Sequence, residues 1–127
     1  MKRDPDLIRQ ILLAIEAKPN VVSLMSAKNI NLPNWSEQEI NYHLSLLVEA
    51  EYIHAVDNRY QGESHMNATR LTWKGHEFLD AARDNTRWEK AKTLMAQIGG
   101  LAFDVLKPLL TDMARSAVAS SLGLPQS

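Results

Sequence analysis

The chain has 127 residues, of which 45% are hydrophobic and 23% charged, and its formal net charge is −1. These values fit one globular domain with a short appendage, and they exclude a disordered chain and a polybasic protein that binds nucleic acid by bulk charge. The absence of cysteine excludes disulfide frameworks, thiolate zinc sites and cysteine nucleophiles. The sequence begins without an apolar signal segment and contains no run of roughly 18 apolar residues, so we expect a cytoplasmic protein with no membrane contact.

The first predicted helix runs from Pro5 to about Ala17. Asp4 suits the N-cap and Pro5 the first helical position, and the apolar residues that follow recur at helical spacing. The segment from 20 to 35 is ambiguous, because its apolar residues from Val21 to Met25 fit either a short strand or one helical turn.

The second predicted helix runs from Glu37 to about Ala50, and it begins with the capping-box pair Ser36 and Glu39. At about 100° per residue, one face of this helix is apolar and is expected to be buried. That face consists of Ile40, Leu44, Leu47 and Val48.

Two strands follow, at 52–56 and 68–71, and the polar segment Asp57–Asn67 joins them into a hairpin. Thr72 then caps a helix from Trp73 to about Arg83. Gly75 in its first turn costs about 1 kcal/mol relative to Ala, which predicts close packing at that position.

The C-terminal part is predicted to be helical. Thr86 and Glu89 have capping-box spacing, and Gly99-Gly100 is expected to end that helix. Its apolar residues recur at 3–4–3 spacing and form one face, which consists of Trp88, Ala91, Met95 and Ile98. A last helix is predicted from about Ala102 to Leu122, with a kink or a restart at Pro108.

This order of elements predicts an α+β, mostly helical fold. We expect a winged helix-turn-helix domain over residues 1–84, a C-terminal helical extension over 85–123 and a tail over 124–127. The helix before the hairpin then takes the place of the recognition helix of a DNA-binding protein.

Several sequence blocks carry a resemblance to a known family: Met-Lys-Arg-Asp at the start, residues 39–47 with Tyr-His-Leu, residues 71–80 with Leu-Thr-Trp-Lys-Gly-His-Glu-Phe-Leu-Asp, and Trp88-Glu89-Lys90. Through them, residues 1 to about 92 resemble a family of uncharacterised phage and prophage proteins that carries a "domain of unknown function" label and is similar to winged-helix regulators. The resemblance implies a fold and a phage setting but no activity. Many relatives have Gly where this chain has Glu51. Because a left-handed backbone is strained for Glu, we expect this helix to end without a left-handed residue.

The exposed face of the second helix is the candidate binding surface. It carries Gln38, Asn41, Tyr42, Ser45, Leu46 and Glu49. Gln38 and Asn41 have the chemistry that reads adenine edges, but the helix has no Lys or Arg for phosphates. The main hypothesis is a DNA-binding transcriptional regulator in which Gln38, Asn41, Tyr42 and Ser45 meet bases. The alternative is an adaptor or inhibitor that binds a host or phage protein through the same face, and a third interpretation is that Tyr42 and Leu46 cover the chain's own C-terminal helices.

Further candidates lie outside this helix. The residues expected near phosphates are Arg3, Arg59, Tyr60, His65 and Arg70, although an ordinary mobile hairpin is the simpler interpretation of the loop. The last helix carries a broad apolar stripe that predicts either packing onto the domain or a homodimer. The stripe consists of Val105, Leu106, Leu109, Leu110, Met113, Ala117 and Val118.

No catalytic, metal or cofactor site is expected. The four histidines lack the spacings of zinc ligands, and the sequence has no nucleophile elbow, phosphate loop or dinucleotide-binding turn. We expect His43 and His76 to be structural, with hydrogen bonds at the edge of the core.

Overall fold

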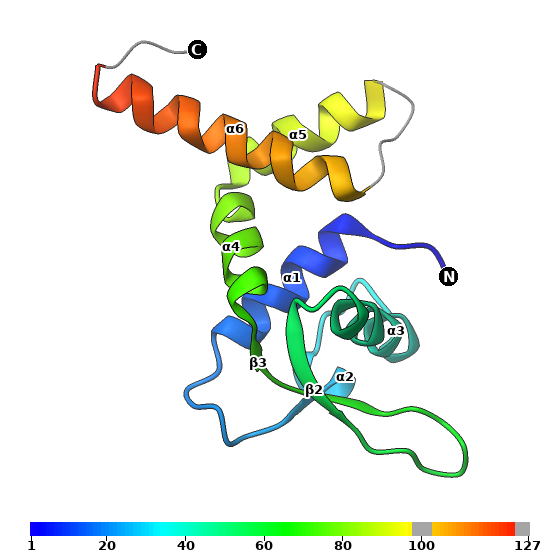
Figure 1. The fold of residues 1–127 in the computed structure, drawn as a ribbon. Coiled ribbons are helices and arrows are strands. Elements are labelled where there is room, and N and C mark those ends of the chain that lie inside the picture. The colour runs from blue at the N-terminus through cyan, green and yellow to red at the C-terminus, as the bar shows by residue number, and fades with distance from the viewer. Residues whose placement is uncertain (98–102, 124–127) are drawn as a thin grey trace. The chain divides into compact units, whose positions relative to one another are not determined.

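The computed structural model describes residues 1–97 and 103–123. The chain divides into two compact units, Met1–Leu79 and Asp80–Ser127, and the boundary between them lies within a helix. The first unit holds α1 (Pro5–Glu16), β1 (Met25–Ser26), α2 (Ala27–Ile30), α3 (Glu37–Glu49), β2 (Ile53–Asp57), β3 (Met66–Leu71) and most of α4 (Trp73–Ala82). The second holds α5 (Asn85–Gln97) and α6 (Phe103–Ser121). The predicted α+β, mostly helical class is confirmed (Figure 1).

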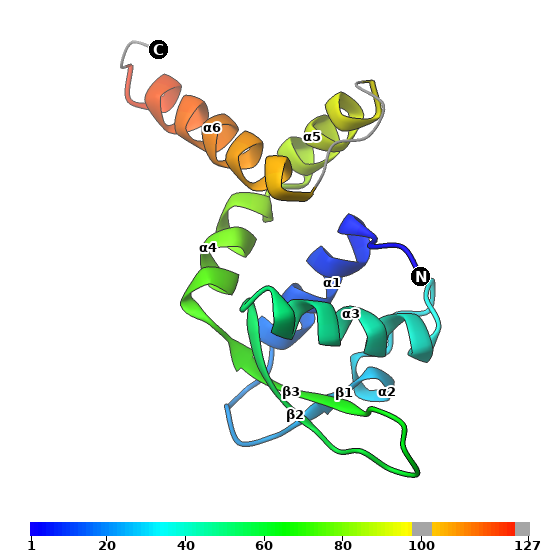
Figure 2. The same cartoon turned by 45° about the vertical axis from the view of Figure 1, so that its right-hand side comes forward.

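The sheet has three antiparallel strands in the order β1-β3-β2, so β3 is central. Ile53 pairs with Leu71 and both are buried, whereas the next pair, His54 and Arg70, is exposed. Helices α1 and α3 pack against β3, and Figures 1 and 2 both show α3 alongside the β2–β3 hairpin. The second strand of the hairpin is two residues longer than predicted, because β3 begins at Met66 and not at residue 68.

The segment from 20 to 35 contains both of the elements that its sequence allowed, at shifted positions. Met25 and Ser26 form β1 and pair with Ala68 and Asn67. Ser26 and Asn29 then form a reciprocal capping box that starts the one-turn helix α2. Val21 and Val22 are exposed, so the strand formed where β3 offered a partner and not where hydrophobicity was greatest.

Asp4 fixes the start of α1, as predicted. Its carboxylate accepts the backbone N–H groups of Asp6 and Leu7, and it also accepts the Trp35 indole N–H at 2.9 Å. The Asp4 backbone N–H donates to Nε2 of the buried His43, so Nε2 carries no proton and Nδ1 is the nitrogen that donates to the Glu39 carbonyl oxygen. The structural role expected of His43 is confirmed, whereas His76 is exposed and the same expectation is wrong for it.

The end of α3 contradicts the expectation that it would avoid a left-handed residue. Glu51 adopts φ +63°, and the N–H groups of Glu51 and Tyr52 donate to the carbonyl oxygens of Val48 and Leu47. This is the Schellman pattern that normally uses Gly. The two capping hydrogen bonds and the burial of Tyr52 hold Glu51 in a conformation it disfavours by about 1 kcal/mol or more.

Gly75 confirms the predicted close packing. A Cβ atom at this position would lie 2.1 Å from the Tyr52 carbonyl oxygen. The same oxygen accepts the Thr72 N–H, and the Thr72 hydroxyl caps α4 by accepting the Gly75 N–H. Helix α4 therefore starts in direct contact with the backbone that follows α3.

Lys18 forms hydrogen bonds with the backbone of β3. Its ammonium donates to the carbonyl oxygens of Ala68 and Thr69. Partial burial lowers the pKa of this ammonium.

The second unit differs from its prediction at the start of α5. Asp84, not Thr86, caps α5, because its carboxylate accepts the Arg87 N–H at 2.8 Å and is a stronger acceptor than a hydroxyl. Of the two outcomes predicted at Pro108, a kink or a restart, the restart does not occur, because α6 runs through Pro108 as one helix. Trp88, Ala91 and Met95 form the buried face predicted for α5. Ile98 and the predicted terminator Gly99-Gly100 lie outside the described residues, as do the last four residues.

Candidate binding groove

A defined turn shapes the hairpin loop, residues 58–65. Tyr60 and Glu63 exchange two backbone hydrogen bonds of 3.0 Å, and the central residues Gln61 and Gly62 have φ of +52° and +81°. Two positive φ values characterise the type I′ turn, whose twist matches that of the flanking strands. The loop is thus an ordered continuation of the hairpin.

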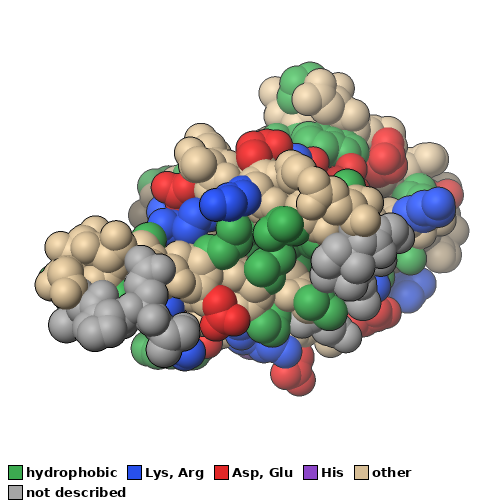
Figure 3. Space-filling model, turned by 90° about the horizontal axis from the view of Figure 1, so that it is seen from above, with side chains coloured by type: hydrophobic (Ala, Val, Ile, Leu, Met, Phe, Trp, Pro, Cys, Tyr) green, Lys and Arg blue, Asp and Glu red, His purple; other side chains and the backbone are tan. Residues whose placement is uncertain are grey.

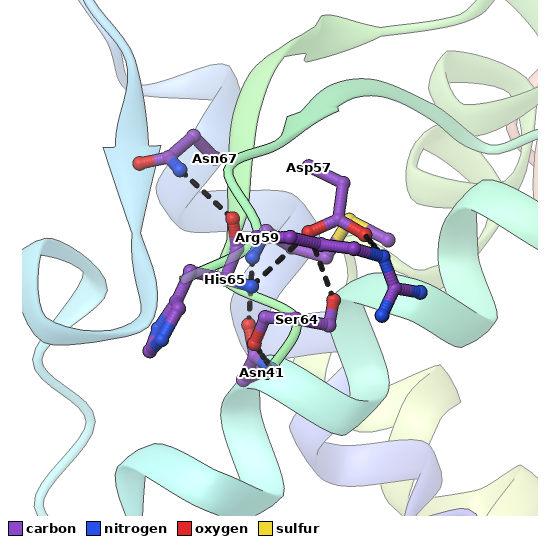
Figure 4. Close-up of polar contacts among 7 residues, drawn as sticks. Asn41, Asp57, Arg59, Ser64, His65 and Asn67 are labelled. Atoms are coloured by element: carbon purple, nitrogen blue, oxygen red, sulfur yellow. Dashed lines mark hydrogen bonds and ion pairs between the residues drawn. The ribbon is translucent and has the colours of Figure 1, made fainter. Parts of the chain in front are cut away.

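Asp57 at the end of β2 ties the base of this loop together. One carboxylate oxygen accepts the Ser64 hydroxyl and the His65 N–H, each at 3.1 Å. The other oxygen lies 3.4 Å from Nε of Arg59. Figure 4 shows these side chains grouped around Asp57. The Arg59 side chain remains 68% exposed, yet a carboxylate of its own loop already partners it.

Asn41 connects the loop to α3. Its amide donates to the Ser64 carbonyl oxygen at 2.9 Å and its oxygen accepts the Met66 N–H at 2.8 Å (Figure 4). Both ends of the carboxamide are therefore used by the hairpin. In this arrangement Asn41 positions the loop, and one N–H and one lone pair of its carboxamide are left for another partner.

A groove of about 640 Å³ lies between α3 and the hairpin. It is lined by Met1, Gln38, Asn41, Tyr42, Ser45, Val48, Glu49, Asp57, Arg59, Glu63, Ser64 and Met66. Its charged side chains are three carboxylates, from Glu49, Asp57 and Glu63, and the guanidinium of Arg59. The groove therefore has a negative balance and also contains an exposed aromatic ring, Tyr42.

The structure brings together most of the predicted helix face. Gln38, Asn41, Tyr42, Ser45 and Glu49 all line the groove, whereas Leu46 is half-buried and does not line it. The hydroxyl of Ser45 donates to the Tyr42 carbonyl oxygen at 2.5 Å, within the helix.

The residues expected near phosphates are dispersed. Arg3 is exposed ahead of α1, and Tyr60 is exposed at the loop turn. His65 lines a second hollow of about 360 Å³ together with Lys28 and Glu37. Arg70 is exposed on β3 opposite His54, on the other side of the sheet from the buried pairs that face α3.

The predicted stripe on α6 divides into buried and exposed positions. Leu106 and Leu110 are fully buried, whereas Val105 and Val118 are 43% and 59% exposed. Leu109 and Met113 are half-buried, and Met113 and Ala117 line a hollow of about 410 Å³ between α5 and α6. In the view of Figure 3, hydrophobic side chains form clusters between charged ones.

Sequence reasoning missed several groove residues. Val48 was expected to be buried but is half-buried and lines the groove, and Asp57 and Met66 were not singled out. The sequence does contain a signal for the Asp57 and Glu63 carboxylates. They flank Arg59 in the loop, and their negative charges weaken its attraction for a phosphate.

The described part of the chain contains neither a group of metal ligands nor a membrane-spanning helix. Within residues 1–97 and 103–123, no three His, Asp or Glu side chains gather as a metal site would require. Over the same residues, no helix combines the length and hydrophobicity needed to span a bilayer.

Comparison with known proteins places the chain among relatives whose roles are not described. A family model for "Hypothetical protein (DUF2513)" matches residues 2–102. An "Uncharacterized protein" from Haemophilus influenzae is 36% identical over 112 residues, which cover 84% of this chain and 90% of that protein. No solved structure matches the chain. With a model match over more than half its length and a relative at this identity, the chain belongs to the DUF2513 family.

Proposed function

We propose that this chain is a non-enzymatic winged-helix protein that binds another protein through the groove between α3 and the hairpin. Two features support a winged helix: the element order α1-β1-α2-α3-β2-β3, and the pairing of β1 with β3 beside the hairpin. The resemblance to phage and prophage proteins suggests a host or phage protein as the partner.

The charge of the groove is the observation that carries this proposal. Three carboxylates face one guanidinium, and that guanidinium is already paired with Asp57. Residues 1–79 as a whole hold eight Lys and Arg side chains against ten Asp and Glu side chains. Most hydrogen bonds to DNA go to phosphates, which a surface of this charge repels, whereas an exposed Tyr beside polar groups is typical of a protein interface.

Capture from phage-infected and uninfected cells tests the proposal. The full chain should retain a defined partner that Tyr42→Ala loses, because truncation removes the exposed ring at the centre of the α3 face. Val56→Ala is a matched control, since Val56 is similarly exposed but belongs to a strand position outside the groove. Equal capture by all three proteins would contradict the proposal.

DNA-binding regulation is the second candidate, and the placement of α3 favours it. A winged-helix arrangement would present α3 as the recognition helix, and the Gln38 side chain is exposed there. If this candidate is correct, fluorescence anisotropy with duplex DNA will show binding at about 50 mM salt that weakens steeply towards about 200 mM. We expect no such binding, and its observation would replace the protein-binding proposal.

A further inference from the structure

We infer that the groove between α3 and the hairpin accepts a basic segment of the partner in which an apolar side chain is flanked by Lys or Arg. This inference rests on the proposed protein-binding function and specifies the chemistry of the partner at the same site.

The charges at the groove define the first requirement. Glu49 at the end of α3 and Glu63 in the hairpin loop are both exposed and come from opposite sides of the groove. A single cationic segment lying between them would meet a carboxylate on each side. Asp57 adds a third carboxylate, and its Arg59 partner is a flexible, exposed side chain that a cation of the ligand can displace.

The apolar lining defines the second requirement. The groove also contains Tyr42, Val48 and Met66, which are apolar or aromatic and partly accessible. A ligand with charge alone would leave this surface exposed to water. A ligand with an apolar side chain next to its cations covers it and gains the free energy of burial as well.

The chain's own first residues illustrate the fit. Met1 lines the groove, and Lys2 and Arg3, which follow it in the chain, are both exposed. An apolar residue that two cations follow in the chain thus already reaches this groove. A partner segment of the same character would compete with Met1 for its place in the groove.

Fluorescent peptides test this chemistry directly. A soluble peptide that repeats Met-Lys-Arg should bind the full chain more tightly than one that repeats Ser-Lys-Arg, which has the same charge without the apolar side chain. A peptide that repeats Met-Glu-Asp should not bind. Titrations at low salt and at about 200 mM salt should show weakening with salt, as expected for exposed charges.

Charge-neutralising variants locate the site. Glu49→Gln and Glu63→Gln should each weaken binding of the Met-Lys-Arg peptide by about 1.4-fold to fivefold, the range for one exposed ion pair. Glu51→Gln is the matched control, because Glu51 is an exposed carboxylate two residues away that does not line the groove. Its affinity should equal that of the unmodified chain.

The failures of the two ideas are distinguishable. An absence of peptide binding, or equal weakening by Glu51→Gln, overturns the basic-segment inference. In that case a Tyr42-dependent partner captured from cells still supports the protein-binding function. Salt-sensitive DNA binding that the Met-Lys-Arg peptide does not affect overturns both.

Discussion

The backbone of Tyr52 joins three elements of the first unit. Its N–H closes the end of α3, and its carbonyl oxygen accepts the Thr72 N–H and contacts Gly75. Its ring stacks on Phe78 with centroids 5.4 Å apart. The neighbouring Glu51 and Gly75 are therefore the residues at which backbone geometry limits the choice of side chain.

Gly75→Ala is expected to destabilise the chain by about 1–3 kcal/mol, the usual cost of forcing extra atoms into a packed site. The added Cβ would overlap the Tyr52 carbonyl oxygen, which is backbone and can move only with α3 and β2. Chemical denaturation measures the change in the free energy of unfolding. His76→Ala, at the exposed next position of α4, should change it little.

Glu51→Gly is expected to stabilise the chain by about 0.5–1 kcal/mol. Gly adopts φ +63° without the steric penalty of a Cβ, and this gain exceeds its greater loss of backbone freedom on folding. Glu51→Ala keeps the Cβ and should leave the free energy of unfolding nearly unchanged. A loss of stability in Glu51→Gly would show that the Glu side chain itself contributes.

At the scale of elements, Asn41 determines where the hairpin loop lies relative to α3. It makes two hydrogen bonds to the backbone of a segment 23 to 25 residues away. Asp57 organises the same loop from within. The groove is thus shaped by two polar side chains, each of which accepts a backbone N–H of the hairpin.

Asn41→Ala is expected to detach the loop from α3 and to lower the free energy of unfolding by about 1–3 kcal/mol, because two partly buried hydrogen bonds are lost. Asn41→Asp should have an intermediate effect, since a carboxylate can accept the Met66 N–H but cannot donate to the Ser64 carbonyl oxygen. Hydrogen exchange should show faster exchange of the Met66 amide in both variants. Ser45→Ala on the same face is the control and should not alter that exchange.

At the scale of the whole molecule, self-association through α6 stays a prediction. Leu106 and Leu110 are buried, whereas Val118 near the end of the helix is exposed. Two copies that pair through the exposed part of the stripe would form the two-fold arrangement typical of small regulators.

Val118→Asp is expected to convert a dimer into a monomer, because the carboxylate would have to be buried in the interface without a partner. Sedimentation at several protein concentrations measures the mass. Ser120→Asp adds the same charge on the opposite side of the helix and should leave the dimer intact. A monomeric unmodified chain would show that the exposed positions of α6 have no partner copy.

The helices and the hairpin can be predicted from the residues that form them, because their signals are local. Asp4, Ser36 and Thr72 each satisfy backbone donors two or three residues away, so the starts of α1, α3 and α4 can be predicted from neighbouring residues alone. The Glu51 backbone and the Asp84 cap were mispredicted even though they are local, because capping preferences are averages that surrounding contacts can override.

The set of side chains that meet in the groove depends on contacts between segments that are distant in the chain. Asn41 has the same chemistry whether it reads a base or holds a hairpin, and the choice depends on where the backbone of Ser64 and Met66 comes to lie. In the same way β1 formed where β3 offered free hydrogen-bonding groups, not at the more hydrophobic Val21 and Val22. Hydrogen bonds and charges act through space over a few ångströms, and the sequence does not state which distant residues fall within that range.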